Sequence, residues 1–241
     1  MIVRLDSVES TNRYCEFLDL GEVEELTCYW AMEQTAGIGQ RGNTWFSGNR
    51  GENLTFSLIL KPTFLPAAAQ FRLTQALSLA LCDFLEELKN TKIKWPNDIY
   101  VDGHKICGTL TSCRYAGETI SSAICGIGLN VNQTEFPDWV PNPTSLALLT
   151  GKRYDTETLL QQLLACIENR YNDLKAGTDP TPEYLARLLN LGVPCRYIYD
   201  GREITATITG VDNYGRLLLN AADGRHLCCD MKEISLAQMP R

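Results

Sequence analysis

The sequence predicts an α+β fold, in which a mixed domain of strands and helices is followed by a small all-β barrel. Up to about residue 190, short apolar runs typical of buried strands alternate with amphipathic segments that have helical spacing. Beyond that point, β-branched or aromatic runs are separated by Asp-Gly and Asn-Tyr-Gly turns, which indicates about five short strands. We therefore expect two domains, spanning residues 1–190 and 191–241.

The composition is that of a globular protein without a general affinity for nucleic acid. Of its 241 residues, 44% are hydrophobic and 21% are charged. The formal net charge of −7 argues against binding to phosphate backbones, which requires clustered Lys and Arg. No apolar run approaches the roughly 18 residues of a membrane helix, and the first residues lack a signal-peptide pattern. We expect no nucleic acid and no membrane among its partners.

Ten cysteines are scattered along the chain without a C-x-x-C pair. Most lie inside apolar runs such as LALCDFL, where a reduced cysteine behaves as a small buried hydrophobic residue. Only two histidines accompany them, so we expect no zinc site. This pattern predicts a reduced, cytoplasmic protein.

The N-terminal elements begin with a strand that leads into a short helix. Ser10 or Thr11 is suited to cap this helix, and Gly21 is suited to end it. Residues 26–34 form an apolar run that predicts a buried strand, and residues 54–62 predict a second one.

A long helix is expected over residues 67–89, where apolar residues recur at three- and four-residue spacing after Pro66. A hairpin follows, and then a strand over residues 120–132 and a Pro-rich loop. Two further helices are expected over residues 156–175 and 182–190, before the chain enters the small barrel.

The glycine-rich stretch at residues 35–53 has no periodicity and predicts a loop. Residues 37–42 match G-x-G-x-x-G, but a dinucleotide-binding fold also needs a helix directly after the motif. Residues 43–53, NTWFSGNRGEN, contain two glycines and an Asn that break any helix, so we reject that interpretation. Two alternatives stay open: the loop cradles phosphates through backbone N–H groups, or it is a flexible connector.

The stretch KWPNDIYVDGHK, residues 94–105, predicts a β-hairpin that brings opposite charges together. Residues 102–103, Asp-Gly, are suited to a two-residue type I′ turn, which would place Tyr100 opposite Lys105. Because side chains alternate between faces, Asp98 would lie on the face of Lys105, roughly 7–8 Å away along the diagonal. A functional site and a solvated sheet edge are both compatible with this spacing.

The strand at residues 120–132 ends in GIGLNVN. Glycines at such a position permit close approach of a ligand, and Asn130 offers both a donor and an acceptor. An ordinary strand end would look the same.

Five segments, taken in order, resemble biotin protein ligases. They are STN at 10–12, EQTAGIGQRGNTW at 33–45, KWPND at 94–98, KICGTL at 105–110 and GIGLN at 126–130. The resemblance runs through essentially the whole chain, and KWPND followed by the lysine of K-x-x-G is its most specific part. It implies a class II synthetase-like mixed β-sheet with flanking helices and an SH3-like C-terminal barrel. The first residues do not show the helix-turn-helix extension of ligases that double as repressors, so we expect the monofunctional type.

The resemblance implies an ATP-dependent ligase. Members join biotin to ATP as biotinyl-5′-adenylate with Mg²⁺ and then transfer biotin to one lysine of a biotin carboxyl carrier protein. Two alternatives are a lipoate or other acyl ligase of the same fold, against which KWPND argues, and a biotin-binding module without chemistry. The sequence does not determine the oligomeric state, and a homodimer is one of the states it allows.

Matching the family's motifs assigns roles to individual positions. Lys105 matches the catalytic lysine, Lys94 a residue at the phosphates, and Asp98 a carboxylate that orients Lys105 or helps to hold Mg²⁺. The positions matched to biotin binding are Ser10, Thr11, Asn12, Gln34, Gly37, Ile38, Lys105, Gly108, Leu110 and Gly126. The positions matched to ATP binding are Gln40, Arg41, Asn43, Trp45, Lys94, Asn97 and Asn130. The metal ligands stay unassigned.

The glycine loop departs from the family's pattern. Members often read Gly-Arg-Gly-Arg-Arg-Gly-Arg-x-Trp, whereas this chain has Ile38, Gln40 and Asn43 at three of the four arginine positions. Only Arg41 is kept. Because Gln40 removes a positive charge near the phosphate or carboxylate, we expect weaker retention of the adenylate than in arginine-rich relatives.

Overall fold

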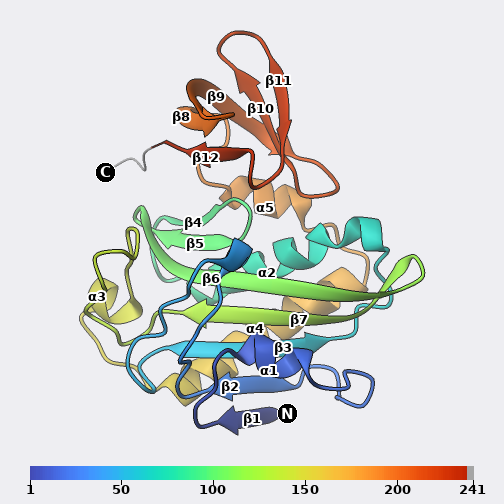
Figure 1. Ribbon diagram of the computed structural model, residues 1–241, viewed down its shortest axis with the longest axis vertical. Coiled ribbons are helices and arrows are strands. Elements are labelled where there is room, and N and C mark those ends of the chain that lie inside the picture. The colour runs from blue at the N-terminus through green and yellow to red at the C-terminus, as the bar shows by residue number, and fades with distance from the viewer. Residues whose placement is uncertain (238–241) are drawn as a thin grey trace.

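The computed structural model describes residues 1–237, apart from the Arg41 side chain, and contains two β-sheets of unequal size (Figure 1). The larger sheet lies in the part of the chain before residue 130. Its seven strands lie in the order β1-β2-β3-β7-β6-β5-β4. Their bounds are Ile2–Leu5 (β1), Cys28–Ala31 (β2), Leu54–Leu60 (β3), Thr91–Lys94 (β4), Asp98–Val101 (β5), His104–Ala116 (β6) and Thr119–Leu129 (β7). The β1–β2 pair is parallel and the other neighbouring pairs are antiparallel. The predicted mixed sheet is therefore confirmed.

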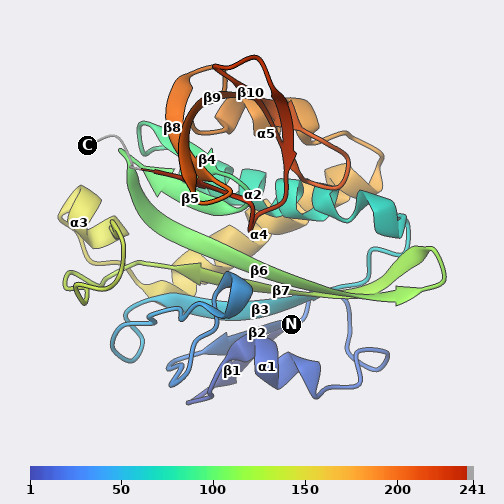
Figure 2. The ribbon, with the colours of Figure 1, turned by 45° about the horizontal axis from the view of Figure 1, so that its top comes forward.

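The smaller sheet contains five antiparallel strands in the order β11-β10-β9-β8-β12. Their bounds are Pro194–Tyr199 (β8), Arg202–Val211 (β9), Leu217–Ala221 (β10), His226–Cys229 (β11) and Ile234–Leu236 (β12). Figure 2 shows these strands curving around one another above the larger sheet. This is the small SH3-like unit that the sequence predicts.

Helices cover the two faces of the larger sheet unequally. The helices α2 (Phe71–Phe84) and α4 (Thr156–Lys175) pack on each other and enclose the main core against one face. The helix α5 (Thr181–Arg187) extends this layer toward the smaller sheet (Figure 1). The short helix α1 (Thr11–Glu16) lies against β3 and β7, and α3 (Leu146–Thr150) follows the Pro-rich loop.

Alternation along the central strands decides what each face carries. Leu58 of β3 points into the main core, whereas its neighbour Ile59 joins Ile124 of β7 in a smaller cluster beneath α1. Because side chains on one face are two residues apart, Gly126 and Gly128 lie on the same face as Ile124. The glycine-rich end of β7 therefore faces away from the main core, on the side of α1.

The long helix is shorter than the predicted range of 67–89. The chain first makes a 3₁₀ turn at Ala67–Ala69, and α2 ends at Phe84. Leu85 is still only 2% exposed, and a turn follows in which the Leu88 N–H bonds to the Leu85 carbonyl. The apolar pattern thus continues past the helix, because the following turn packs on the same core.

Other boundaries also shift. The helix expected at 156–175 is confirmed, but the helix expected at 182–190 covers Thr181–Arg187. The first helix ends at Glu16 rather than Gly21, and α3 was not predicted. Short helices give too few periodic positions for the sequence to define their ends.

The two sheets share one core. Leu188, Tyr197 and Leu217 all belong to the main apolar cluster, although they come from both sides of the expected division at residue 190. That division stays a prediction. Among the described residues, none of the helices combines the length and apolarity that crossing a membrane requires.

Candidate active site

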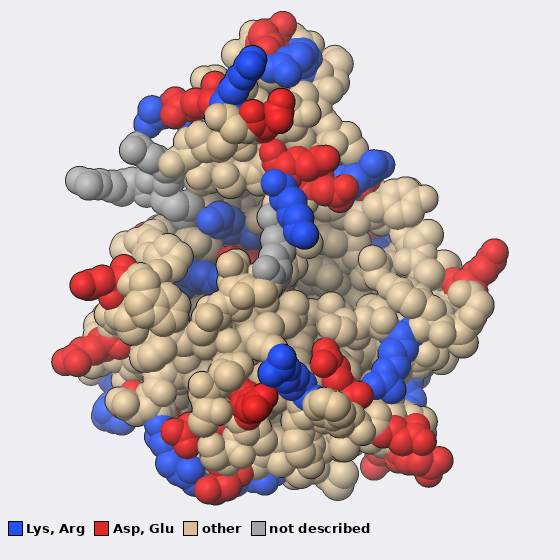
Figure 3. All heavy atoms as spheres, in the orientation of Figure 1, with Lys and Arg blue, Asp and Glu red and all other residues tan. Residues whose placement is uncertain are grey.

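A pocket of about 430 Å³ lies between the glycine-bearing face of the larger sheet and the smaller sheet. Figure 3 shows the surface hollowed beneath the smaller sheet. The pocket brings together fifteen of the residues that the sequence singled out: Ser10, Thr11, Asn12, Gln34, Ile38, Gln40, Asn43, Trp45, Lys94, Asn97, Asp98, Lys105, Gly108, Leu110 and Gly126. These come from segments spread over the first 130 residues, so only the folded sheet places them side by side.

Glycines form the floor of the pocket because other side chains need their space. A Cβ on Gly126 would overlap the side chain of Asn12, and a Cβ on Gly128 would overlap the indole of Trp45. On the adjacent strand, a Cβ on Gly108 would lie 3.2 Å from a carboxylate oxygen of Asp98. The glycines therefore let polar and aromatic side chains lie directly on the sheet.

A polar network joins α1 to the loop that follows β2. The Gln34 side-chain oxygen accepts hydrogen bonds from the Thr11 backbone N–H (2.8 Å) and hydroxyl (3.2 Å). The Asn12 amide donates to the Leu110 carbonyl at 3.0 Å, and its oxygen accepts from Ser57 at 2.5 Å. This network holds several donors and acceptors at the pocket wall in fixed positions, which suits a ligand with paired N–H and C=O groups.

The predicted hairpin is confirmed, with one addition. Asp102 and Gly103 have φ values of 48° and 79°, as a type I′ turn requires, and Tyr100 pairs with Lys105. A β-bulge then shifts the register, so that Asp98 lies opposite Gly108. A regular hairpin would have placed Asp98 opposite Cys107; the bulge instead sets it opposite a residue without a side chain.

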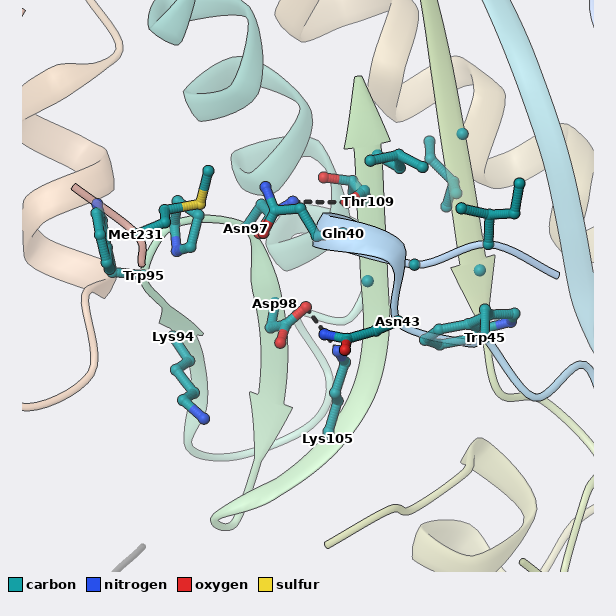
Figure 4. A pocket seen from close by; sticks show the side chains of 18 of the residues that line it. Gln40, Asn43, Trp45, Lys94, Trp95, Asn97, Asp98, Lys105, Thr109 and Met231 are labelled. Atoms are coloured by element: carbon teal, nitrogen blue, oxygen red, sulfur yellow. Dashed lines mark hydrogen bonds and ion pairs between the residues drawn. The ribbon is translucent and has the colours of Figure 1, made fainter. Parts of the chain in front are cut away.

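Lys105 and Asp98 form an ion pair at the pocket, with 2.7 Å between Nζ and Oδ1 (Figure 4). The Lys105 ammonium also lies 5.7 Å from the centre of the Trp45 ring. Its backbone is held from the other side by residues 142–144, since its N–H donates to the Asn142 carbonyl and its carbonyl accepts from Thr144, each at 2.8 Å. The lysine is thereby fixed at both ends.

Lys94 differs from Lys105 in having no carboxylate at ion-pair distance among the described residues. Its Nζ contacts the Tyr100 hydroxyl at 3.4 Å and lies 5.3 Å from that ring. Burial lowers the pKa of Lys94, opposed by the charge of Asp98 and assisted by that of Lys105. A half-buried ammonium with incomplete compensation is suited to receive an anion.

The glycine loop is not an irregular connector but folds back on itself. Ile38 and Thr44 form an antiparallel bridge, and the Trp45 N–H donates to the Gly37 carbonyl at 2.9 Å. A 3₁₀ turn at Gln40–Gly42 closes its tip. In Figure 4 Gln40, at the tip of this hairpin, lies beside Asn97, which belongs to the turn between β4 and β5.

Three of the predicted site residues, Gly37, Asn130 and Arg41, are not among the described residues that line the pocket. Gly37 lies behind the wall, where a Cβ would be 2.5 Å from the Trp45 carbonyl. Asn130 is buried, and its amide donates to the Thr144 carbonyl at 2.9 Å. The side chain of Arg41 lies outside the part of the chain that the structure describes.

Sequence reasoning missed a whole side of the pocket. Ser57 went unnoticed because it lies inside an apolar strand, yet it hydrogen-bonds to the network around α1. The smaller sheet and its turns supply a further group of lining residues: Tyr197, Ile208, Leu217, Met231, Ile234, Ser235 and Leu236. They carry no local signal, because only the docking of the two sheets brings them to the site.

Two family descriptions match the chain. The Biotin/lipoate A/B protein ligase family matches residues 5–130, and the Biotin protein ligase C terminal domain matches residues 191–235.

Individual proteins agree with these matches. The chain is 33% identical over 226 residues to the bifunctional ligase/repressor BirA of Bacillus subtilis, covering 91% of this chain and 69% of that protein. It is 31% identical over 207 residues to the biotin--[acetyl-CoA-carboxylase] ligase of Paracoccus denitrificans, covering 82% and 85%. The structure resembles that of the biotin protein ligase from Aquifex aeolicus in complex with biotin and ATP. The TM-score is 0.79 at 27% identity, and the match covers 98% of both chains.

Proposed function

Because the chain belongs to the biotin protein ligase family and is a ligase, we propose that it activates biotin with ATP as biotinyl-5′-adenylate. It then transfers biotin to a lysine of a biotin carboxyl carrier protein. One observation carries this proposal: a single pocket holds both the polar network of Thr11, Asn12 and Gln34 and the charges of Lys94, Asp98 and Lys105. The first group suits an uncharged ring with donors and acceptors, and the second suits anions.

The first half-reaction joins two anions. A carboxylate oxygen of biotin attacks the α-phosphorus of ATP, the bond to the β-phosphate breaks, and pyrophosphate leaves. Lys105 is suited to stabilise this step because an ammonium with three donors can bridge carboxylate and phosphate oxygens. Asp98 holds Lys105 in place before the substrates arrive, and Lys94 offers its under-compensated charge to the phosphates.

In the second half-reaction, the amine of an acceptor lysine attacks the acyl carbon of the adenylate. An amide forms, AMP leaves, and the amine loses a proton. The closed glycine loop and the Trp45 indole cover the strands beneath and would keep water from the mixed anhydride. In this proposal the loop protects the intermediate until the acceptor enters.

The residues present fit a Mg²⁺ ion that arrives with the nucleotide. Within the described chain, no group of three or more His, Cys, Asp or Glu gathers to form a dedicated cage. Mg²⁺ typically needs only one or two carboxylates beside substrate phosphates, and the Asp98 carboxylate lines the pocket. When bound, the ion neutralises phosphate charge, while Asp98 would hold it beside Lys105.

Pyrophosphate exchange into ATP tests the proposal directly. We expect exchange with biotin but not with lipoate or octanoate, and its loss by at least about a hundredfold in Lys105→Ala. The matched control Lys152→Ala removes an exposed lysine far along the chain and should leave exchange unchanged. Exchange with lipoate would assign the chain to the alternative acyl ligase. Biotin binding without exchange would favour the binding module.

The proposal also includes an acceptor protein and a cytoplasmic location. A relative's name includes acetyl-CoA-carboxylase as its substrate, so a carrier domain of that kind is the acceptor to test first. All ten cysteines are free, which agrees with a reducing cytoplasm.

A further inference from the structure

A turn of three residues connects Lys94 to Asp98, two of the charged residues at the pocket. Lys94 ends β4 and pairs across the sheet with Asp98, the first residue of β5. Between them lie Trp95, Pro96 and Asn97. Because the turn is so short, any displacement of it moves both charged side chains relative to Lys105.

Three hydrogen bonds hold this turn, and each has its partner in a different part of the fold. The Asn97 amide donates to the Thr109 carbonyl of β6 at 2.6 Å. The Trp95 indole N–H donates to the Gly215 carbonyl, in the turn between β9 and β10, at 2.9 Å. The third bond runs to the Pro96 carbonyl from the hydroxyl of Tyr184 in α5, at 2.8 Å. Two of the three anchors therefore lie beyond the larger sheet.

The two outer anchors, Gly215 and Tyr184, are joined through the ring of Phe71. The ring of Phe71, at the start of α2, meets the ring of Tyr184 edge-on with 5.6 Å between centres. Gly215 has a φ of 85°, and a Cβ there would overlap the same Phe71 ring. Gly215, Phe71 and Tyr184 thus form a continuous contact from the smaller sheet to α5. Figure 1 shows both elements beside β4 and β5.

We propose that Trp95 and Tyr184 are positioning residues for adenylation. They hold the turn so that Lys94 and Asp98 keep their places beside Lys105. The turn between β9 and β10 contributes to this positioning only through the Gly215 carbonyl that accepts from Trp95. This inference rests on the proposed function. Trp95 lines the pocket whereas Tyr184 is not among its lining residues, so Tyr184 gives the cleaner test of positioning.

Deleting the hydroxyl of Tyr184 tests the inference with little change of volume. We expect Tyr184→Phe to lower kcat for pyrophosphate exchange about tenfold, because small displacements of reacting groups are costly. The KM and Kd for biotin should stay unchanged, since the network around Thr11 and Gln34 is untouched. The matched control is Tyr171→Phe, which removes the hydroxyl of another buried tyrosine, bonded to Glu25 at 2.7 Å and not to the turn at residues 95–97. It should stay within twofold of wild type.

A second variant and a second measurement separate positioning from general loosening. Trp95→Phe should lower kcat similarly, and the double variant should lose less than the product of both effects, because both act on one turn. Amide hydrogen exchange over residues 94–98 should quicken in Tyr184→Phe but not in Tyr171→Phe.

Three outcomes would overturn the inference. The first is equal kcat in Tyr184→Phe and Tyr171→Phe, and the second is a biotin KM that changes as much as kcat. The third is unchanged hydrogen exchange over residues 94–98 in Tyr184→Phe. A wild-type protein that exchanges with no acid would instead refute the proposed function, and hydrogen exchange would still judge the anchoring of the turn.

Discussion

The carboxylate of Asp98 reaches Lys105 at 2.7 Å across a β-bulge, with Gly108 between them on the sheet. The pair is half-buried, so the ammonium is oriented without being removed from the pocket. Orientation of this kind is what a lysine needs if it is to bridge two anionic substrates.

Neutralising the carboxylate should therefore impair the reaction. We expect Asp98→Asn to lower kcat for pyrophosphate exchange by about ten- to a hundredfold, because the amide holds Lys105 less strongly. Asp102→Asn makes the same chemical change in the same hairpin, and Asn also tolerates positive φ. Loss of activity in both variants alike would refute a specific role for Asp98.

The lowered pKa of Lys94 predicts that its charge lowers the stability of the free protein while it favours the binding of an anion. The unfolded chain binds this proton more tightly than the folded one, so wild-type stability should rise as the pH climbs from the lowered pKa toward 10.5. Lys94→Met should raise the Tm at pH 7, by about 2–4 °C for each kcal/mol gained. This advantage should shrink near pH 10.5.

Thermal unfolding with and without ATP checks the same variant. ATP should raise the Tm of the wild type more than that of Lys94→Met, because the half-buried ammonium gains an anionic partner only with the ligand. An equal rise in both proteins would show that Lys94 does not meet the phosphates.

The close contact of Gly128 with Trp45 predicts a sharp response to one methyl group. Gly128→Ala should displace the indole and lower kcat/KM for ATP at least about tenfold, which exchange kinetics and tryptophan fluorescence would both report. Gly210→Ala is the control, since a Cβ there meets nothing within 4 Å. Wild-type kinetics in Gly128→Ala would refute a role for this contact.

Gln40 lines the pocket where arginine-rich relatives carry a positive charge. Gln40→Arg should slow the release of the adenylate, measured as the half-life of the bound intermediate after excess biotin and ATP are removed. The control is Gln162→Arg, which makes the same chemical change on the exposed side of α4. Release from Gln40→Arg that is no slower than from wild type would refute the idea.

Local chemistry determined the parts of the site that the sequence predicted. The turn at Asp102-Gly103 depends on two φ values that these residues adopt easily, so the pairing of Tyr100 with Lys105 followed from the sequence alone. The helix at 156–175 and the change to short strands after residue 190 likewise depend on patterns within a few turns of chain. Such features need no knowledge of distant neighbours.

Only the tertiary structure decided the rest. The bulge that sets Asp98 opposite Gly108, the packing of Trp45 on Gly128 and the bond from Trp95 to the Gly215 carbonyl all depend on how separate segments dock. Docking is set by the fit of side chains more than a hundred residues apart, as between Trp95 and the smaller sheet. The sequence thus determined which groups the site contains, and packing decided where each of them is held.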